Sequence, residues 1–134
     1  MTRNGKTGKA VKSLSINRLN PRRGEVWLID FNPTKGAEIQ KVRNAIVISS
    51  DAVGALPVKL VAPITTWKES FAQKYWLVKL KPHKDNGLTQ DSAVDALQIR
   101  SVDINSRFIK KVGFLPAVTM EEICTAVAII IEYA

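Results

Sequence analysis

The sequence predicts one mainly β domain, a small antiparallel barrel that ends in a C-terminal α-helix. The chain has 134 residues, enough for a single domain with a real core. From residue 24 onward, short runs of β-branched and aromatic residues alternate with turns rich in Gly, Pro and Asn. Many strands at short spacing favour a closed or nearly closed antiparallel barrel. After residue 118 the apolar residues take helical spacing instead.

The predicted strands are short and separated by recognisable turns. The first strand covers 25–31, and the turn residues of 32–36 (NPTKG) open a loop that runs to about residue 42. Residues 85–87 (DNG) form a hairpin-type turn. The other strands are expected at 44–50, 58–64, 75–80, 92–102 and 108–113, the 92–102 segment having room for a helical turn.

The predicted helix begins with a capping box. Thr119 is the expected N-cap residue, and Glu122 lies three positions later, where it can bond back to the cap. The apolar stripe that follows is wide for a helix on so small a barrel, so we expect its excess to lie at a subunit interface. Its members are Met120, Ile123, Cys124, Val127, Ile130 and Ile131.

The net charge of +8 belongs mostly to the N-terminal segment. The first 23 residues contain seven Arg or Lys and no acid, whereas the remainder contains 13 basic and 12 acidic residues. We therefore predict a basic, disordered tail at 1–22 and a nearly neutral domain at 23–134. Such a tail raises the affinity for any polyanion without sequence preference, and a solvated leader with no binding role is equally consistent.

No metal site and no cofactor are predicted. The chain has one histidine, His83, and one cysteine, Cys124, without a His/Cys/Asp cluster at ligand spacing. A single histidine also excludes paired-imidazole cleavage of RNA within one chain. The sequence has no nucleophile elbow, phosphate-binding glycine loop or dinucleotide fingerprint. The lone cysteine and the lack of any apolar run typical of a signal peptide or membrane span lead us to expect a cytoplasmic protein.

Four segments carry the strongest functional pattern. Residues 24–38 (GEVWLIDFNPTKGAE) form a strand and a long loop, and 41–49 (KVRNAIVIS) run from an arginine through an apolar stretch to a serine. Residues 61–66 (VAPITT) contain P-I-T, and 98–103 read QIRSVD. In this order and spacing, the four segments resemble the MazF/PemK family of bacterial toxins.

The resemblance implies an SH3-like barrel of the plasmid-maintenance-toxin type. It also implies the activity of the toxin of a type II toxin–antitoxin system, which is metal-independent, sequence-specific cleavage of single-stranded RNA. The family's catalytic arginine and threonine map onto Arg43 and Thr65. The implied partners are a second copy of the chain, whose interface loops would form the RNA groove, and an acidic, partly disordered antitoxin that would occupy it.

The chemistry explains these residue types. Attack of a ribose 2′-OH on the adjacent phosphate gives a 2′,3′-cyclic phosphate and a 5′-OH through a phosphorane with added negative charge. The planar, permanently charged guanidinium of Arg43 can neutralise that charge, and the Thr65 hydroxyl can donate to another oxygen. Arginine is a poor base near neutral pH, so Glu38 is the expected residue for orienting or deprotonating the 2′-OH.

Other residues are expected to bind the RNA, and each has a plain structural alternative. Trp67 beside Lys68 can stack on a base or simply pack. Gln98 and Arg100 can read base edges or support a strand. Without the resemblance, Arg43 would more simply pair with Glu38, and Thr65 would bond a turn backbone. The expected RNA-binding residues are Lys35, Gly36, Trp67, Lys68, Gln98 and Arg100.

The sequence departs from the family pattern at two places and leaves two other functions open. Asn44 replaces the usual proline after the arginine, and 38–41 (EIQK) differs from the commoner E-Q-x-G, so the RNA motif can differ too. A non-enzymatic toxin of the same fold that poisons DNA gyrase would not need Arg43 together with Thr65. A basic, non-catalytic nucleic-acid-binding module would depend on its tail and release no new RNA ends.

Overall fold

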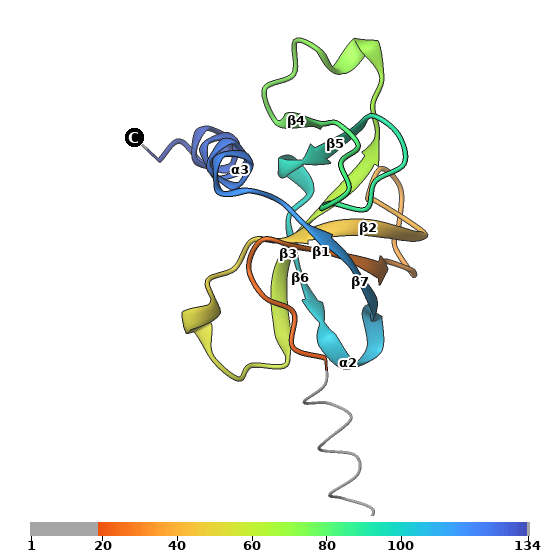
Figure 1. The fold of residues 1–134 in the computed structure, drawn as a ribbon, viewed down its shortest axis with the longest axis vertical. Helices are drawn as coiled ribbons and strands as arrows, with labels where there is room; N and C mark the ends of the chain where they lie inside the picture. The colour runs from red at the N-terminus through yellow and green to blue at the C-terminus, as the bar shows by residue number, and fades with distance from the viewer. Residues whose placement is uncertain (1–18, 134) are drawn as a thin grey trace, which may run out of the picture.

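The computed structural model describes residues 19–133, so most of the predicted tail at 1–22 lies outside the described residues. The described chain is mainly β with a C-terminal helix, as predicted (Figure 1). Its elements are β1 (Glu25–Asp30), β2 (Val42–Val47), the 3-10 turn η1 (Asp51–Val53), β3 (Val58–Thr66), η2 (Glu69–Phe71), β4 (Leu77–Leu80), β5 (Ser92–Asp95), η3 (Ala96–Gln98), β6 (Arg100–Asp103), α2 (Ile104–Arg107), β7 (Phe108–Phe114) and α3 (Ala117–Ile130).

One long strand organises the sheet. The strand order is β4-β5-β3-β2-β1-β7, and every pairing is antiparallel. The strand β3 pairs with β6 along its first half, with β2 in the middle and with β5 at its end. Because β3 changes partners along its length, the sheet bends: β4 and β5 lie at one end beside α3, and β6 and β7 lie toward the other (Figure 1).

The sheet is not a fully closed barrel. Among the described residues, β4 and β7 end the strand order and do not pair with each other. The turn that follows β4 reaches β7 instead, where Phe114 N donates to the Asp85 carbonyl at 2.8 Å. A Cβ on Gly113 would lie 2.3 Å from that carbonyl oxygen, and a Cβ on Gly87 would lie 2.5 Å from the side chain of Val112. Two glycines thus allow a backbone contact to take the place of the missing strand pair.

Both faces of the sheet are buried, in two clusters. Side chains alternate along a strand, so Ile46 of β2 joins one cluster while Ala45 and Val47 join the other. The α3 cluster, named for the helix that covers it, contains Val26, Ile46, Ile48, Ala62, Ile64, Val94, Met120 and Ile123 among its members. The barrel cluster, enclosed by the curved strands, contains Trp27, Ile29, Phe31, Ala45, Val47, Val61, Val102, Ile104 and Phe108.

The C-terminal helix begins earlier than the capping box predicts. It starts at Ala117, and the Pro116 carbonyl accepts from Thr119 N and Met120 N, both at 3.1 Å. Thr119 is therefore inside the first turn and is not the N-cap; Pro116 takes the N-cap position without a side-chain capping bond. The buried face is also narrower than the predicted stripe: it comprises Met120, Ile123 and Ala126, while Cys124 and Ile131 are exposed.

Several predicted strands have different ends. The 75–80 strand shortens to β4, and the 92–102 segment divides into β5, η3 and β6, which confirms the helical turn. The 58–64 strand continues through Pro63 to Thr66. The short helix α2, which was not predicted, is capped by Asp103, whose Oδ2 accepts from Ser106 N at 2.7 Å.

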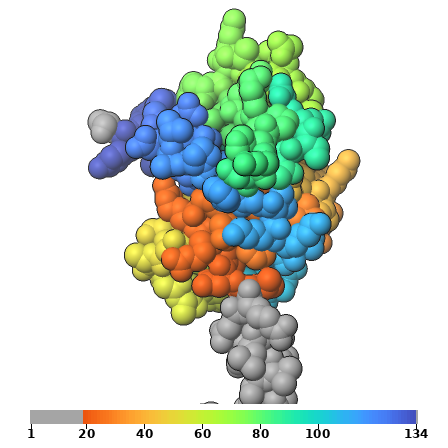
Figure 2. Space-filling model, viewed as in Figure 1, coloured from red at the N-terminus to blue at the C-terminus, as the bar shows by residue number. Residues whose placement is uncertain are grey.

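The loops between the central strands project from opposite sides of the molecule. In the space-filling view, the loop between β1 and β2 (light orange) extends on one side, and the loop between β2 and β3 (yellow) extends on the other (Figure 2).

None of the helices in the described part of the chain is long and apolar enough to cross a membrane.

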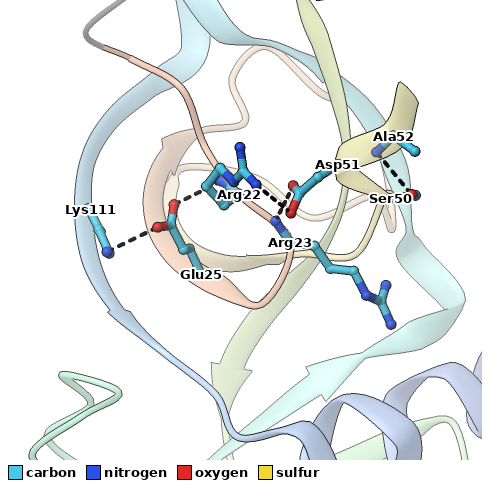
Figure 3. A network of polar contacts seen from close by, with 7 residues as sticks. All are labelled: Arg22, Arg23, Glu25, Ser50, Asp51, Ala52 and Lys111. Atoms are coloured by element: carbon cyan, nitrogen blue, oxygen red, sulfur yellow. Dashed lines mark hydrogen bonds and ion pairs between the residues drawn. The ribbon is translucent and has the colours of Figure 1, made fainter. Parts of the chain in front are cut away.

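A polar network fixes the start of the domain (Figure 3). Glu25 Oε1 accepts from Arg22 N at 2.8 Å, and Lys111 Nζ lies 3.0 Å from Glu25 Oε2. The Asp51 carboxylate accepts from Arg23 N at 2.9 Å and pairs with the Arg22 guanidinium at 3.3 Å. The Arg23 guanidinium reaches the Ile48 carbonyl and lies 3.3 Å from Cys124 Sγ. These contacts join the segment before β1 to η1, β7 and α3.

The Glu25 carboxylate is the most connected charge of this network. Trp27 Nε1 also donates to it, at 2.9 Å. Burial alone would raise the pKa of Glu25, but the bonds from Arg22 and Trp27 and the Lys111 ammonium outweigh burial and hold the pKa below its ordinary value. The ionised carboxylate therefore stabilises the fold.

Glu25→Gln should lower the free energy of unfolding at pH 7 by about 1–2 kcal/mol, because charge-assisted bonds are lost. Since the folded-state pKa is lowered, this difference is fully present above about pH 5, where the unfolded carboxyl is also ionised, and is lost as the pH falls through the lowered pKa. Chemical unfolding of both proteins across this pH range measures it. Glu121→Gln, at an exposed position on α3, is the control; an equal difference at all pH values would contradict the assignment.

Candidate active site

Arg43 and Thr65 lie together where β2 and β3 meet the β1–β2 loop. The pairing of Ala45 with Pro63 places Arg43, two residues earlier, opposite Thr65, two residues later. Arg43 Nη1 lies 3.3 Å from Thr65 Oγ1, and Arg43 Nε donates to the Gln40 carbonyl at 2.8 Å. Both side chains are half-buried. These bonds use two of the five guanidinium N–H donors, so the group keeps donors for an anion.

Glu38 does not pair with Arg43 in the described part of the chain. Its Oε1 accepts from Lys35 N at 3.0 Å, and its own N donates to the Lys35 carbonyl at 3.1 Å. Gly36, with a φ of +59°, allows this tight turn. The simpler alternative, in which Arg43 only pairs with Glu38, is therefore wrong. Lys35 and Gly36 are exposed at the tip of the loop.

Gln98 ties the β1–β2 loop to the sheet. Its Oε1 accepts from Ile39 N at 2.6 Å, and its Nε2 donates to Asp95 Oδ2 at 3.2 Å. Asp95 also caps η3 by accepting from Leu97 N at 3.1 Å. Burial raises the pKa of Asp95, and the hydrogen bonds from Leu97 and Gln98 offset only part of that effect. Ile39 and Gln40 are adjacent. One short segment is therefore bound to Gln98 through the Ile39 amide and to Arg43 through the Gln40 carbonyl.

Arg100 is half-buried, and its guanidinium carbon lies 5.6 Å from the centre of the Phe31 ring. This cation–π contact places a positive charge between β6 and the β1–β2 loop. The charge lies on the barrel-cluster side of the sheet, because Arg100 pairs with Val61 of that cluster. Thr65 faces the same side, since it lies two residues from Pro63 and four from Val61 on β3.

Trp67 lies just after the end of β3, two residues beyond Thr65. Lys79 Nζ lies 4.8 Å from the centre of the Trp67 ring, Phe71 packs edge-on at 5.7 Å, and the indole N–H donates to Glu69 at 3.0 Å. One face of the ring is thus covered by an ammonium group, so stacking on a base there would require Lys79 to move. Lys68 is exposed beside it.

Lys79 is on the same face of the sheet as Thr65. Ala93 pairs with Thr65 on one side and with Lys79 on the other, and directly paired residues point to the same face. Lys79 also lies 3.9 Å from Asp91. On this face, Arg43 of β2 and Lys79 of β4 therefore lie on either side of the Thr65 position.

A pocket of about 390 Å³ opens between the β1–β2 loop and the η3–β6 segment. Its polar lining residues are Thr34, Glu38, Gln98 and Arg100. The Thr34 hydroxyl oxygen is buried, and no hydrogen-bond partner exists for it among the described residues. An unsatisfied buried hydroxyl costs about 1–3 kcal/mol, which makes this pocket wall unusual.

The described residues contain no group of three His, Cys, Asp or Glu side chains placed to hold a metal ion. His83 and Asp85 form an exposed pair, with Nδ1 3.5 Å from Oδ2. Both belong to the turn that contacts β7, away from the paired ends of β2 and β3.

Three residues of this region were missed by sequence reasoning. In the sequence, Thr34 is one of the turn residues of 32–36, and only the packing of the loop shows that its hydroxyl is buried. Asp95 precedes Gln98 by three residues, which is the spacing of a local cap, so the sequence contained a weak signal for it. Lys79 lies within a strand, and only the strand register brings it across from Thr65.

The fold is that of MazF toxins of known structure. The chain superposes with a TM-score of 0.71 on MazF from Deinococcus radiodurans, at 24% identity, over 84% of this chain and 96% of that one. A mycobacterial endoribonuclease in complex with its cognate antitoxin gives a TM-score of 0.66 at 21% identity, over 86% of this chain and 98% of that one.

Sequence comparison defines the family. Residues 22–131 match the family described as the PemK-like, MazF-like toxin of type II toxin–antitoxin systems. The endoribonuclease toxin ChpB of Escherichia coli is 32% identical over 82% of this chain and 93% of its own length. The endoribonuclease MazF9 of Mycobacterium tuberculosis is 31% identical over 76% of this chain and 88% of its own length. The chain therefore belongs to the PemK/MazF toxin family, as its motifs predicted.

Gln98→Leu should loosen the β1–β2 loop, because the Ile39 amide loses its acceptor. We expect at least about tenfold faster amide exchange at residues 38–41 with little change at the centres of β2 and β3. Hydrogen exchange followed by mass spectrometry measures this. The control is Gln90→Leu, which removes an exposed bond to Thr66; equal exchange in both variants would contradict the role of Gln98.

Proposed function

We propose that this chain is the endoribonuclease toxin of a type II toxin–antitoxin pair. It cleaves single-stranded RNA without a metal, by attack of a ribose 2′-OH on the adjacent phosphate, and leaves a 2′,3′-cyclic phosphate and a 5′-OH. The observation that carries this proposal is the contact between Arg43 Nη1 and Thr65 Oγ1 at 3.3 Å. Family membership supports the reaction, and the geometry supports the two residues.

Arg43 and Thr65 suit a growing negative charge. The Gln40 carbonyl orients the guanidinium, so its remaining donors are fixed before the substrate arrives. The Thr65 hydroxyl is set beside the guanidinium and can donate to a second phosphate oxygen. Donors held in place in this way stabilise a transition state more than the ground state, because they need no reorganisation as charge develops.

Glu38 remains our proposed group for orienting or deprotonating the 2′-OH. Its carboxylate lies in the loop that also carries Gln40, and it lines the pocket beside the catalytic pair. In this role the ribose would lie across the β1–β2 loop, with the phosphate over Arg43.

The RNA strand is proposed to follow the face that carries the catalytic pair. Lys35 and Gly36 would contact it from the loop tip, and Trp67 and Lys68 from the end of β3. Lys79 adds a cation to this path through its place across Ala93 from Thr65. Gln98 and Arg100 lie on the pocket side.

The remaining parts of the proposal concern assembly. We propose a homodimer, because α3 leaves Val118, Ile129 and Ile131 exposed at 50–63%. An acidic antitoxin and a cytoplasmic location follow from the type of system. The domain is proposed to begin at about residue 23, which is supported by a family match that starts at residue 22.

Arg43→Ala should reduce cleavage of a long RNA in EDTA by at least about 100-fold, because a fixed charged donor is removed. Arg43→Lys keeps the charge without the planar fork and should recover only part of the rate. Mapping of the 5′-OH ends measures this. Arg22→Ala, which removes an exposed ion pair with Asp51, is the matched control. Unchanged cleavage by Arg43→Ala would rule out the mechanism. If the wild type binds RNA but releases no ends, the non-catalytic alternative is favoured.

Thr65→Val should lower kcat by about 10- to 100-fold with a smaller change in KM, because the hydroxyl acts mainly in the transition state. Thr65→Ser retains the hydroxyl and should keep most of the rate. Single-turnover cleavage of a short RNA separates binding from chemistry. Thr66→Val, on the next residue of the same strand and facing the other way, is the control; equal losses for Thr65→Val and Thr66→Val would contradict the role of Thr65.

A further inference from the structure

The pocket beside the catalytic pair has the size of a small-molecule site. Its volume of about 390 Å³ is within the range of ligand pockets, which is roughly 300–1,000 Å³. Four apolar and four polar side chains line it, so a flat ligand can pack on the apolar ones while the polar ones fix its orientation. The apolar wall residues are Pro33, Ile39, Leu97 and Ile99. Leu97 is 57% exposed, so one wall is open to a ligand from solvent.

Thr34 contributes a polar group that the fold itself does not use. Its hydroxyl oxygen is buried without a partner in the described chain, although the residue lines the pocket. Rotation about χ1 between staggered positions exchanges the hydroxyl with the methyl group. Because the present position offers no hydrogen bond, this rotation breaks none, and a ligand that supplies a partner would favour it.

The three other polar groups of the pocket, Glu38, Gln98 and Arg100, are already held in place, Glu38 by the bond from Lys35 N. The Gln98 amide is fixed at both ends, by Ile39 N and by Asp95 Oδ2. Its Nε2 carries a second N–H, which those two bonds do not use. The Arg100 guanidinium is held over the Phe31 ring. A hydroxyl, a carboxylate, an amide and a guanidinium beside four apolar side chains match the polar edge and the faces of a nucleobase.

Two hydrogen bonds link the pocket to the proposed site of cleavage. Gln98 in the pocket bonds Ile39 N, and the adjacent Gln40 carbonyl bonds the catalytic guanidinium of Arg43. A base in the pocket would therefore belong to a nucleotide close to the cleaved phosphate. A base bound there would also contact Ile39, the residue next to the Gln40 carbonyl that orients Arg43.

We infer that this pocket binds one nucleobase of the RNA substrate, and that the Thr34 hydroxyl is a specificity-determining group that reads its edge. This inference rests on the proposed function, since it assigns part of the substrate to that same site. Correct base binding satisfies the Thr34 hydroxyl, whereas a base without a matching group leaves it unpaired. Discrimination at this one position follows from that difference.

The test compares cleavage of a randomised RNA pool by the full chain and its variants, with the new ends sequenced. Thr34→Val has nearly the same shape without the hydroxyl, and Thr34→Ser retains the hydroxyl. We expect Thr34→Val to reduce the base preference about 10-fold at one position near the cut and to leave the other positions unchanged. Thr34→Ser should keep the preference. Thr89→Val, at an exposed threonine outside the pocket, is the matched control.

Stability provides a second readout. Removal of an unsatisfied buried hydroxyl should leave the melting temperature of Thr34→Val equal to or above that of the wild type. The inference is overturned if Thr34→Val keeps the wild-type preference at every position, or if it loses preference equally at all positions. A wild-type chain that makes no new ends contradicts the proposed function itself. A wild type that cleaves while Thr34→Val shows no local change contradicts only the pocket.

Discussion

The antiparallel register of β2 and β3 is the constraint on which the candidate site depends. Pairing of Ala45 with Pro63 brings Arg43 opposite Thr65, two residues beyond the last buried pair. A slip by one residue would turn every side chain of β2 to the other face. Arg43 would then face the α3 cluster, and Ile46 would leave it. The same alternation that fills both cores therefore also fixes the catalytic pair, and the site cannot change register without loss of the fold.

Burial on both faces explains why the polar chemistry lies at strand ends. In the centre of the sheet, most side chains of β2 and β3 enter either the barrel cluster or the α3 cluster. Charged groups are costly there, and the half-buried guanidinium of Arg43 lies where the sheet gives way to the β1–β2 loop. That loop is attached at Gln98 and in turn holds Arg43 through Gln40. The pocket, the loop and the catalytic pair thus form one connected unit at the edge of two cores.

The sequence predicted the strands and the pair of catalytic residues better than it predicted their surroundings. Strands such as 25–31 were predictable because β-branched and aromatic residues end at clear turns. The start of α3 was not, because Thr119 and Glu122 have the spacing of a capping box, whereas the N-cap residue is Pro116, which makes no side-chain capping bond. The open edge between β4 and β7 depends on a contact between distant backbones. The unpaired Thr34 hydroxyl and the position of Lys79 across from Thr65 arise from tertiary packing, which no local pattern encodes.

The exposed thiol of Cys124 gives the protein a natural attachment point for a spectroscopic probe. It is the single cysteine of the chain and lies on α3, the helix that packs on the α3 cluster, whereas Arg43 and Thr65 face the barrel-cluster side. A maleimide dye would therefore label each protomer at one place, with the sheet between the dye and the candidate site. Energy transfer from that dye to a labelled oligonucleotide would follow RNA docking in real time without any engineered substitution.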